Sequence, residues 1–306
     1  MKTIKIFAYA LMATSGVLLT SCGSDDDGGN DLPPIGGYNS ADEVGADNLV
    51  GYWSFDGSGN EELSNTAPSA SEGVTFSEAD AIKGQAAVFN EGFFNYPSIA
   101  AMANSMESFT ISTWAKVSNN GSTGSVFFSL ARENEWAGNI NFLAETGWQP
   151  ATSDSLTVKG QIVSNNDLGW QDTRNTIKLD QGMIDENATN GPNDTDHVAF
   201  PNKVGGQWMH AVLVWDGSQR MFKVYVNGIK ISNPKWELRG SDESPALAFN
   251  TPVHPVIGAF GTTASGNPVD VWDKALTGQL DEMRVWNKAL GQADIGFLYE
   301  LELAGR

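Results

Sequence analysis

The chain has 306 residues, of which 41% are apolar, 10% aromatic and only 18% charged, with 33 glycines and ten tryptophans. This composition is typical of a β-rich, loop-rich protein rather than a helical one. The 37 acidic against 18 basic side chains give a net charge of −19. Such a surface repels nucleic-acid phosphates, so we exclude nucleic acid as a partner. The single cysteine excludes an internal disulfide.

The first 21 residues have the features of a signal peptide. Lys2 and Lys5 precede the apolar run IFAYALMATSGVLL, which is too short for a transmembrane helix. The following Leu-Thr-Ser-Cys sequence, which ends at Cys22, resembles the lipobox of bacterial lipoproteins. The resemblance implies cleavage before Cys22 and attachment of acyl chains to its thiol. The protein would then be anchored to a membrane through Cys22, since each buried methylene contributes about 0.8 kcal/mol. The alternative is an ordinary signal peptide with an incidental cysteine.

Residues 22–47 are predicted to form a flexible tether. Three aspartates at 25–27 lie among glycines and serines, and Pro-Pro and Gly-Gly pairs at 33–34 and 36–37 prevent regular structure. The aspartates also resemble the acidic export signal of Bacteroidota-type surface lipoproteins. This resemblance implies an outer-membrane protein that faces the extracellular side. The alternative is a plain acidic spacer on a protein that faces the periplasm.

Residues 48–306 show the pattern of many short strands. In chain order the strand segments are NLVGYWSFDG, QAAVFNEG, SFTISTWAKV, SVFFSLAR, QWMHAVLVWDG, MFKVYVNGIKIS, PVIGAF and TGQLDEMRVW. Asn227-Gly228 supplies the pair of positive φ angles that a two-residue type I′ hairpin needs. The tail KALGQADIGFLYELEL predicts a helix. Without strand–helix alternation, we predict one all-β domain, an antiparallel jelly-roll β-sandwich with a short C-terminal helix.

The domain resembles the concanavalin A-like, laminin G-type (LamG) domains of bacterial surface proteins. The stretches that resemble this family are LVGYWSFDG, the SFTISTWAKV strand, the WMH strand, the YVNG hairpin, VIGAF and the ending LDEMRVWNKAL, in that order. The resemblance implies a concanavalin A-like sandwich. Related modules mostly bind glycans or proteins, and some relatives of the broader fold are glycoside hydrolases.

Three insertions distinguish this chain from a minimal domain of that family. They cover about residues 132–206, 233–252 and 262–275, and they are polar. Loops on a sandwich commonly carry specificity. The insertions hold five tryptophans, for which we predict carbohydrate binding because aromatic rings stack on the C–H faces of sugars: Trp136, Trp148, Trp170, Trp236 and Trp272. The alternative is that these rings fasten long loops to the sandwich.

The resemblance also implies a structural calcium ion. Asp56, after the first strand, and Asp281, in the last strand, match acids that recur in the family. Carboxylate oxygens are preferred calcium ligands, and the first and last strands often neighbour each other. The alternative is that Asp56 caps a turn and Asp281 pairs with a cation such as Arg284.

These features together predict a lipid-anchored surface protein that binds a polysaccharide or glycoconjugate. It would hold its ligand for the enzymes and transporters of a surface glycan-uptake machinery. Two alternatives stay open, a protein-binding or adhesion module and a glycoside hydrolase. A retaining hydrolase needs two carboxyl groups about 5 to 5.5 Å apart. Glu133 and Glu135 have strand spacing but lack the third acid of the laminarinase-like pattern.

Overall fold

The computed structural model of the chain describes residues 32–177 and 200–306. The predicted signal peptide, Cys22 and the acidic run lie outside the described residues. Residues 34–306 belong to one compact unit.

The described residues form a 13-stranded sheet in which every strand pair is antiparallel. The strands are β1 (Leu49–Trp53), β2 (Ala70–Ser77), β3 (Ala86–Asn95), β4 (Phe109–Lys116), β5 (Ser125–Arg132), β6 (Glu135–Ala144), β7 (Val158–Val163), β8 (Trp170–Arg174), β9 (Trp208–Asp216), β10 (Met221–Val226), β11 (Ile229–Lys230), β12 (Val253–Ile257) and β13 (Leu276–Trp286). Their order is β11-β10-β9-β4-β13-β3-β12-β5-β6-β7-β8, with β1 on β13 and β2 on β3.

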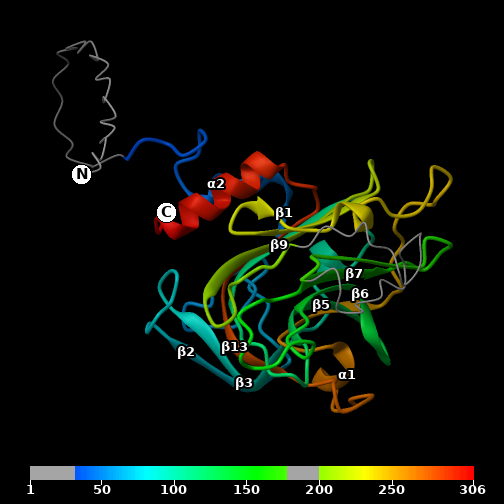
Figure 1. Cartoon of the computed structure of the whole chain (residues 1–306), viewed down its shortest axis with the longest axis horizontal. Coiled ribbons are helices and arrows are strands. Elements are labelled where there is room, and N and C mark those ends of the chain that lie inside the picture. The colour runs from blue at the N-terminus through cyan, green and yellow to red at the C-terminus, as the bar shows by residue number, and fades with distance from the viewer. Residues whose placement is uncertain (1–31, 178–199) are drawn as a thin grey trace, which may run out of the picture. The chain divides into compact units, whose positions relative to one another are not determined.

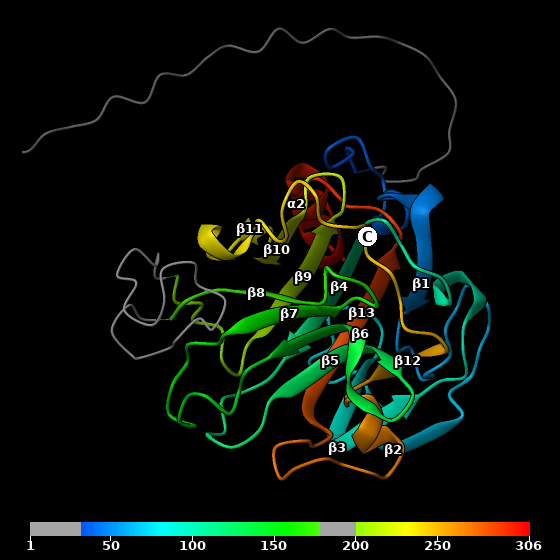
Figure 2. The ribbon, with the colours of Figure 1, turned by 90° about the vertical axis from the view of Figure 1, so that its right-hand side faces the viewer.

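The sheet curls so that its two halves face each other. One half contains β5, β6 and β7 side by side, and the other contains β9, β4 and β13 (Figure 2). The main hydrophobic core lies between them and includes Phe128, Phe142, Leu213 and Phe222. Burial of each such side chain contributes about 1.5–3 kcal/mol. This arrangement confirms the predicted concanavalin A-like fold.

Each of the eight predicted segments contains a strand, and turn chemistry accounts for the hairpin between β10 and β11. Asn227 has φ 51° and Gly228 has φ 74°, as a type I′ turn requires. Strands β2, β6, β7 and β8 were not predicted from the sequence. The described part of the first insertion therefore contains three strands, β6, β7 and β8, and Trp136 and Trp170 lie on strands rather than in loops.

Two α-helices lie in the described part, α1 (Gly261–Ala264) and α2 (Gln292–Leu303). The predicted C-terminal helix is α2, which packs across the outer face of the sheet beside β9 (Figure 1). Short 3-10 helices span Ala41–Glu43, Ala46–Asn48, Ala100–Met102 and Pro234–Trp236. Among the described residues, no helix has both the length and the apolar character needed to cross a membrane.

The compact unit starts earlier than the predicted boundary at residue 48. Ala41 and Val44 are buried, and they join Leu298 of α2 in a second hydrophobic cluster. The Tyr38 hydroxyl donates a hydrogen bond to Asp294 of the same helix at 3.0 Å. Residues 34–47 are thus part of the folded unit rather than tether, because their few apolar side chains cover α2.

A buried ionic cluster connects α2 to the sheet. The guanidinium of Arg284 on β13 contacts Glu282 at 2.7 Å, Asp42 at 3.1 Å and Glu302 of α2. The Trp114 indole also donates to Glu302, at 2.8 Å. Burial raises the pKa of Glu302 to about 8, against the effect of the nearby guanidinium. The positive charge of Arg284 therefore offsets the cost of burying the carboxylates of Glu282 and Glu302.

Candidate functional site

A pocket of about 260 Å³ lies on the face of β6 and β7 that points away from the core. Even-numbered residues of these strands, such as Phe142, pack in the core. Because side chains alternate between the faces, Leu143, Lys159 and Gln161 turn to the pocket. Trp136 reaches it with an even number because the pairing of β6 with β5 is irregular between Glu135 and Ile140. The lining residues are Ser122, Gly124, Trp136, Leu143, Glu145, Gly147, Trp148, Lys159, Gln161, Phe260 and Trp272.

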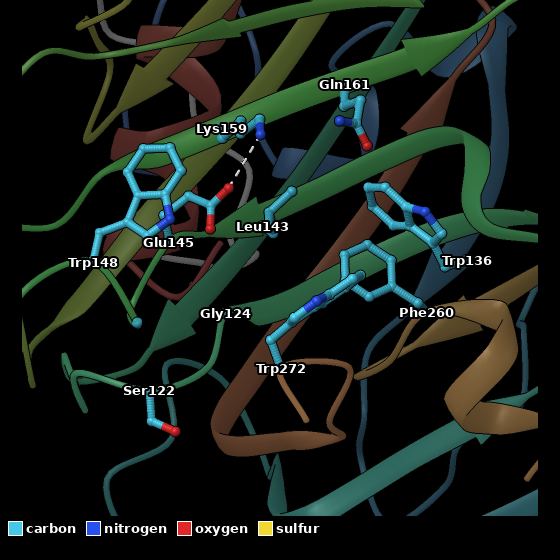
Figure 3. A pocket seen from close by; sticks show the side chains of 11 residues that line it. Ser122, Gly124, Trp136, Leu143, Glu145, Trp148, Lys159, Gln161, Phe260 and Trp272 are labelled. Atoms are coloured by element: carbon cyan, nitrogen blue, oxygen red, sulfur yellow. Dashed lines mark hydrogen bonds and ion pairs between the residues drawn. The ribbon is translucent and has the colours of Figure 1, made fainter. Parts of the chain in front are cut away.

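Three aromatic rings form one wall of the pocket. Trp136 comes from β6, whereas Phe260 and Trp272 come from the segment between β12 and β13 (Figure 3). The centroid of the Trp136 ring lies 5.1 Å from that of Trp272 and 5.3 Å from that of Phe260, both in edge-on geometry. Trp170 of β8 also contacts Trp136, at 5.3 Å, and is 42% exposed. The wall therefore extends to a partly exposed tryptophan.

The segment that carries Trp272 is fixed by its neighbour Asp273. This carboxylate is fully buried. It accepts hydrogen bonds from the Thr262 hydroxyl at 2.6 Å, the Thr263 hydroxyl at 2.5 Å and the Val269 amide at 3.0 Å. Such bonds to a charged group contribute about 1.5–3 kcal/mol each. They hold the segment in the conformation that turns Trp272 toward the pocket.

The floor between the walls is polar. Lys159 of β7 lies directly across from Leu143 of β6 in the strand register. Its ammonium group forms an ion pair with Glu145 at 3.1 Å, which Figure 3 marks with a dashed line. Both side chains are 13% exposed. Gln161 follows on the same face of β7. The floor therefore offers hydrogen-bond donors and acceptors beside aromatic surfaces.

Trp148 stands at the end of the pocket opposite the three rings (Figure 3). Its ring is 42% exposed and lies under two cations, with centroid distances of 5.6 Å to Lys159 and 5.1 Å to Arg174. The backbone amide of Trp148 donates to the Glu145 carbonyl at 3.1 Å, which closes the turn after β6. Cation–π contacts and this turn keep the exposed ring in place.

Trp236 lies apart from the pocket. It is 1% exposed, and the Arg174 guanidinium lies over its ring at 4.4 Å from the centroid. Of the five predicted tryptophans, three line the pocket, Trp170 borders it, and Trp236 is inaccessible to a ligand in this structure. The Pro234–Trp236 helix turns this ring inward, which its polar sequence surroundings did not indicate.

Asp56 and Asp281 hold the same loop. Asp56 accepts a hydrogen bond from the Gln85 amide at 2.6 Å. Asp281 accepts from the Ile82 amide at 2.8 Å and the Lys83 amide at 3.2 Å. Amide hydrogens point at Asp56 Oδ1 and Asp281 Oδ2, whereas Asp281 Oδ1 is buried without a hydrogen-bond partner. The described residues contain no cluster of three His, Cys, Asp or Glu side chains suited to a metal. In this structure one oxygen of each aspartate supports the loop at residues 82–85. Calcium binding stays a prediction. If the protein binds calcium, a chelator should lower its melting temperature.

The buried carboxyl group of Asp281 should make the stability of the fold depend on pH. Burial raises its pKa to about 7, although the Lys83 and Ile82 amides oppose the shift. The fold therefore favours the protonated form, and this stabilisation is complete below about pH 4 and is lost as the pH rises to about 7. Relative to Asp281→Asn, the free energy of unfolding should fall by up to about 4 kcal/mol over that range. Urea unfolding at several pH values measures the difference, and parallel curves for the two proteins would contradict it.

The floor of the pocket and one ring of its wall were not predicted from the sequence. Gly124, Glu145, Lys159 and Phe260 were not predicted, although alternation in NINFLA and VKGQIV could have identified β6 and β7. Lys159 meets Glu145 because of the register in which β6 and β7 pair. The spacing of residues within one segment does not indicate that register.

Comparison with known proteins identifies the family. The family model Laminin_G_3, described as the Concanavalin A-like lectin/glucanases superfamily, matches residues 93–296. This match covers more than half of the chain, which therefore belongs to that superfamily. None of the curated protein sequences matches the chain.

Several solved structures are similar to the chain at low sequence identity. The binding domain of Paraclostridial Mosquitocidal Protein 1 is 15% identical with a TM-score of 0.52, covering 83% of this chain and 52% of that one. The botulinum neurotoxin serotype G binding domain is 10% identical with a TM-score of 0.50, covering 83% and 51%. Domain 4 of AbnA, an extracellular arabinanase from Geobacillus stearothermophilus in complex with arabinotriose, is 18% identical with a TM-score of 0.49, covering 82% and 98%. The chain spans about half the length of the two toxin domains.

Proposed function

We propose that the protein binds carbohydrate in the pocket on β6 and β7. One observation carries the proposal. Trp136 and Trp272 form an aromatic wall that faces Trp148, and a hydrogen-bonding floor lies between them. A sugar ring has apolar C–H faces and a rim of hydroxyls. The aromatic rings cover the faces, while Glu145, Lys159 and other polar floor groups bind the rim.

The floor favours binding over hydrolysis in this pocket. Glu145 supplies the single carboxylate among the lining residues, all of which belong to the described part of the chain. A glycosidase of the usual kind needs two carboxyl groups that flank the scissile bond. Glu135, at the start of β6, is instead 56% exposed and pairs with Arg132 at 3.7 Å. We therefore propose that this pocket binds a sugar without cleaving it.

An array of immobilised neutral, amino and acidic glycans tests the function. The chain without residues 1–22 should bind a defined group of sugars. Trp148→Ala should weaken binding about 5- to 150-fold, because stacking on an aromatic ring is worth about 1–3 kcal/mol, as measured for bases. Trp208→Ala, on β9 and outside the pocket, is the matched control and should bind like the wild type. Silence of the wild type across the array would overturn the proposal.

The lipid anchor belongs to the same proposal. The sequence around Cys22 and the aspartates that follow supports attachment to the outer membrane with the domain on the extracellular side. There it would present bound glycan to an uptake machinery. In membrane fractionation, Cys22→Ala should move the protein out of the membrane fraction, and its retention there would count against lipidation.

A further inference from the structure

We propose that this pocket, if it binds carbohydrate as inferred above, selects a neutral sugar unit through two adjacent hydroxyls and discriminates against uronic acids. One hydroxyl would donate to Glu145 Oε2, and its neighbour would accept from Lys159 Nζ. The way in which the charged groups of the floor pair with one another determines which class of ligand fits the pocket.

The two oxygens of Glu145 have different surroundings. Oε1 accepts from the Lys159 ammonium at 3.1 Å. Within the described part of the chain, no protein donor contacts Oε2, and this atom is not sealed from solvent. Oε2 faces Gly124, where a Cβ atom would lie 3.7 Å away. The missing side chain leaves space beside an acceptor that is ready for a donor such as a sugar hydroxyl.

Lys159 can donate to a ligand but offers little net charge. Its ammonium group lies 3.1 Å from Glu145 and 3.9 Å from Asp172. An ammonium has three N–H groups, so one can serve a hydroxyl oxygen without loss of the ion pair. Adjacent sugar hydroxyls can present a donor and an acceptor side by side, which matches the Glu145–Lys159 pair.

The charges around the floor disfavour an acidic ligand. The lining residues hold one acid and one base, so their net charge is zero. The nearby cations Arg174 and Arg239 pair with Asp172, at 3.7 and 3.5 Å, and do not line the pocket. A sugar carboxylate would approach Glu145 and would lose its hydration without gaining an unpaired cation. Neutral hydroxyls avoid both costs.

The size of the pocket indicates that one sugar unit enters. Its volume of about 260 Å³ is below the roughly 300–1,000 Å³ of pockets that enclose drug-sized ligands. The facing positions of Trp148 and the three aromatic rings enclose the floor from two sides (Figure 3). We therefore expect a terminal or side-chain sugar of a glycan to be recognised.

The test compares sugars that differ only at C6. Methyl glycosides of glucose, galactose and mannose, and of the matching uronic acids, are titrated into the chain without residues 1–22, with tryptophan fluorescence as the readout. At least one neutral glycoside should bind about tenfold or more tightly than its uronate. Loss of either of two adjacent hydroxyls, in deoxy versions of that glycoside, should abolish the preference.

Glu145→Gln keeps the shape of the floor but changes its net charge to +1. This variant should bind the neutral sugar about tenfold more weakly and the uronate more tightly, so that the preference reverses. Glu135→Gln, on the same strand but outside the pocket, should change neither affinity. A wild-type preference for uronates, or equal loss of both ligands in Glu145→Gln, would overturn the inference and leave carbohydrate binding intact. Absence of binding to every sugar here and on the array would overturn both proposals.

Discussion

Replacement of Arg284 by methionine should lower the free energy of unfolding by about 3–5 kcal/mol. The side chain is fully buried, and it pairs with Glu282 at 2.7 Å and with the equally buried Glu302. Without the guanidinium, two carboxylates remain in the interior with no cation opposite them. Methionine restores much of the apolar volume, so that the loss reports the uncompensated charge rather than a cavity.

The pH dependence of this loss identifies its cause. The pKa of Glu302 is already raised by burial, and it should rise further when the cation is removed. A carboxyl group whose pKa is higher in the folded than in the unfolded state stabilises the fold at low pH. This contribution is lost as the pH rises through the folded-state pKa. Urea unfolding of Arg284→Met should therefore show a larger deficit at pH 8 than at pH 5. An additional Glu302→Gln change should restore part of the stability at pH 8.

A surface pair provides the matched control. Arg220 pairs with Asp242, whose side chain is 96% exposed. Arg220→Met should cost at most about 1 kcal/mol, because solvent screens exposed ion pairs. If Arg284→Met were as mild as Arg220→Met, the cluster would contribute little to holding α2 on the sheet.

The fold could be predicted from the sequence where local signals were strong. The Asn227-Gly228 turn and the apolar alternation of β4, β9 and β10 identified the strands of one half of the sandwich. In the other half, β7 and β8 carry polar residues such as Gln161 and Asp172 on the face away from the core. Their sequences thus look like loops. The same polarity equips this face for a ligand, so the features that make the site also obscured its strands.

The site could be predicted only in part. Unusual polar surroundings singled out Trp136, Trp148 and Trp272, and these three do line one pocket. The same criterion selected Trp236, which is buried against Arg174. A tryptophan in polar sequence surroundings is expected to contact something other than the apolar core. That contact can be a sugar or an arginine side chain. Tertiary contacts decide between these, and they are set by strand register over long sequence separations.

Replacement of Gly124 by alanine should weaken ligand binding about tenfold or more without harm to the fold. Gly124 precedes β5 and has no positive φ, so alanine fits its backbone. A Cβ atom there would lie 3.6 Å from Leu143 and 3.7 Å from Glu145 Oε2, both ordinary contacts. The methyl group would occupy the space in which a ligand hydroxyl approaches this oxygen. Loss of a hydrogen bond to a charged acceptor costs about 1.5–3 kcal/mol, which corresponds to the expected loss in affinity.

Thermal unfolding and fluorescence titration with the best array ligand separate the two effects. The melting temperature of Gly124→Ala should equal or exceed that of the wild type, because alanine restricts the unfolded chain. The matched control is Gly296→Ala on α2, where a Cβ atom meets no neighbour within 4 Å. That variant should also be at least as stable as the wild type, since alanine favours a helix by up to about 1 kcal/mol, and its affinity should be unchanged. Unaltered affinity in Gly124→Ala would mean that the ligand does not reach the floor beside Glu145.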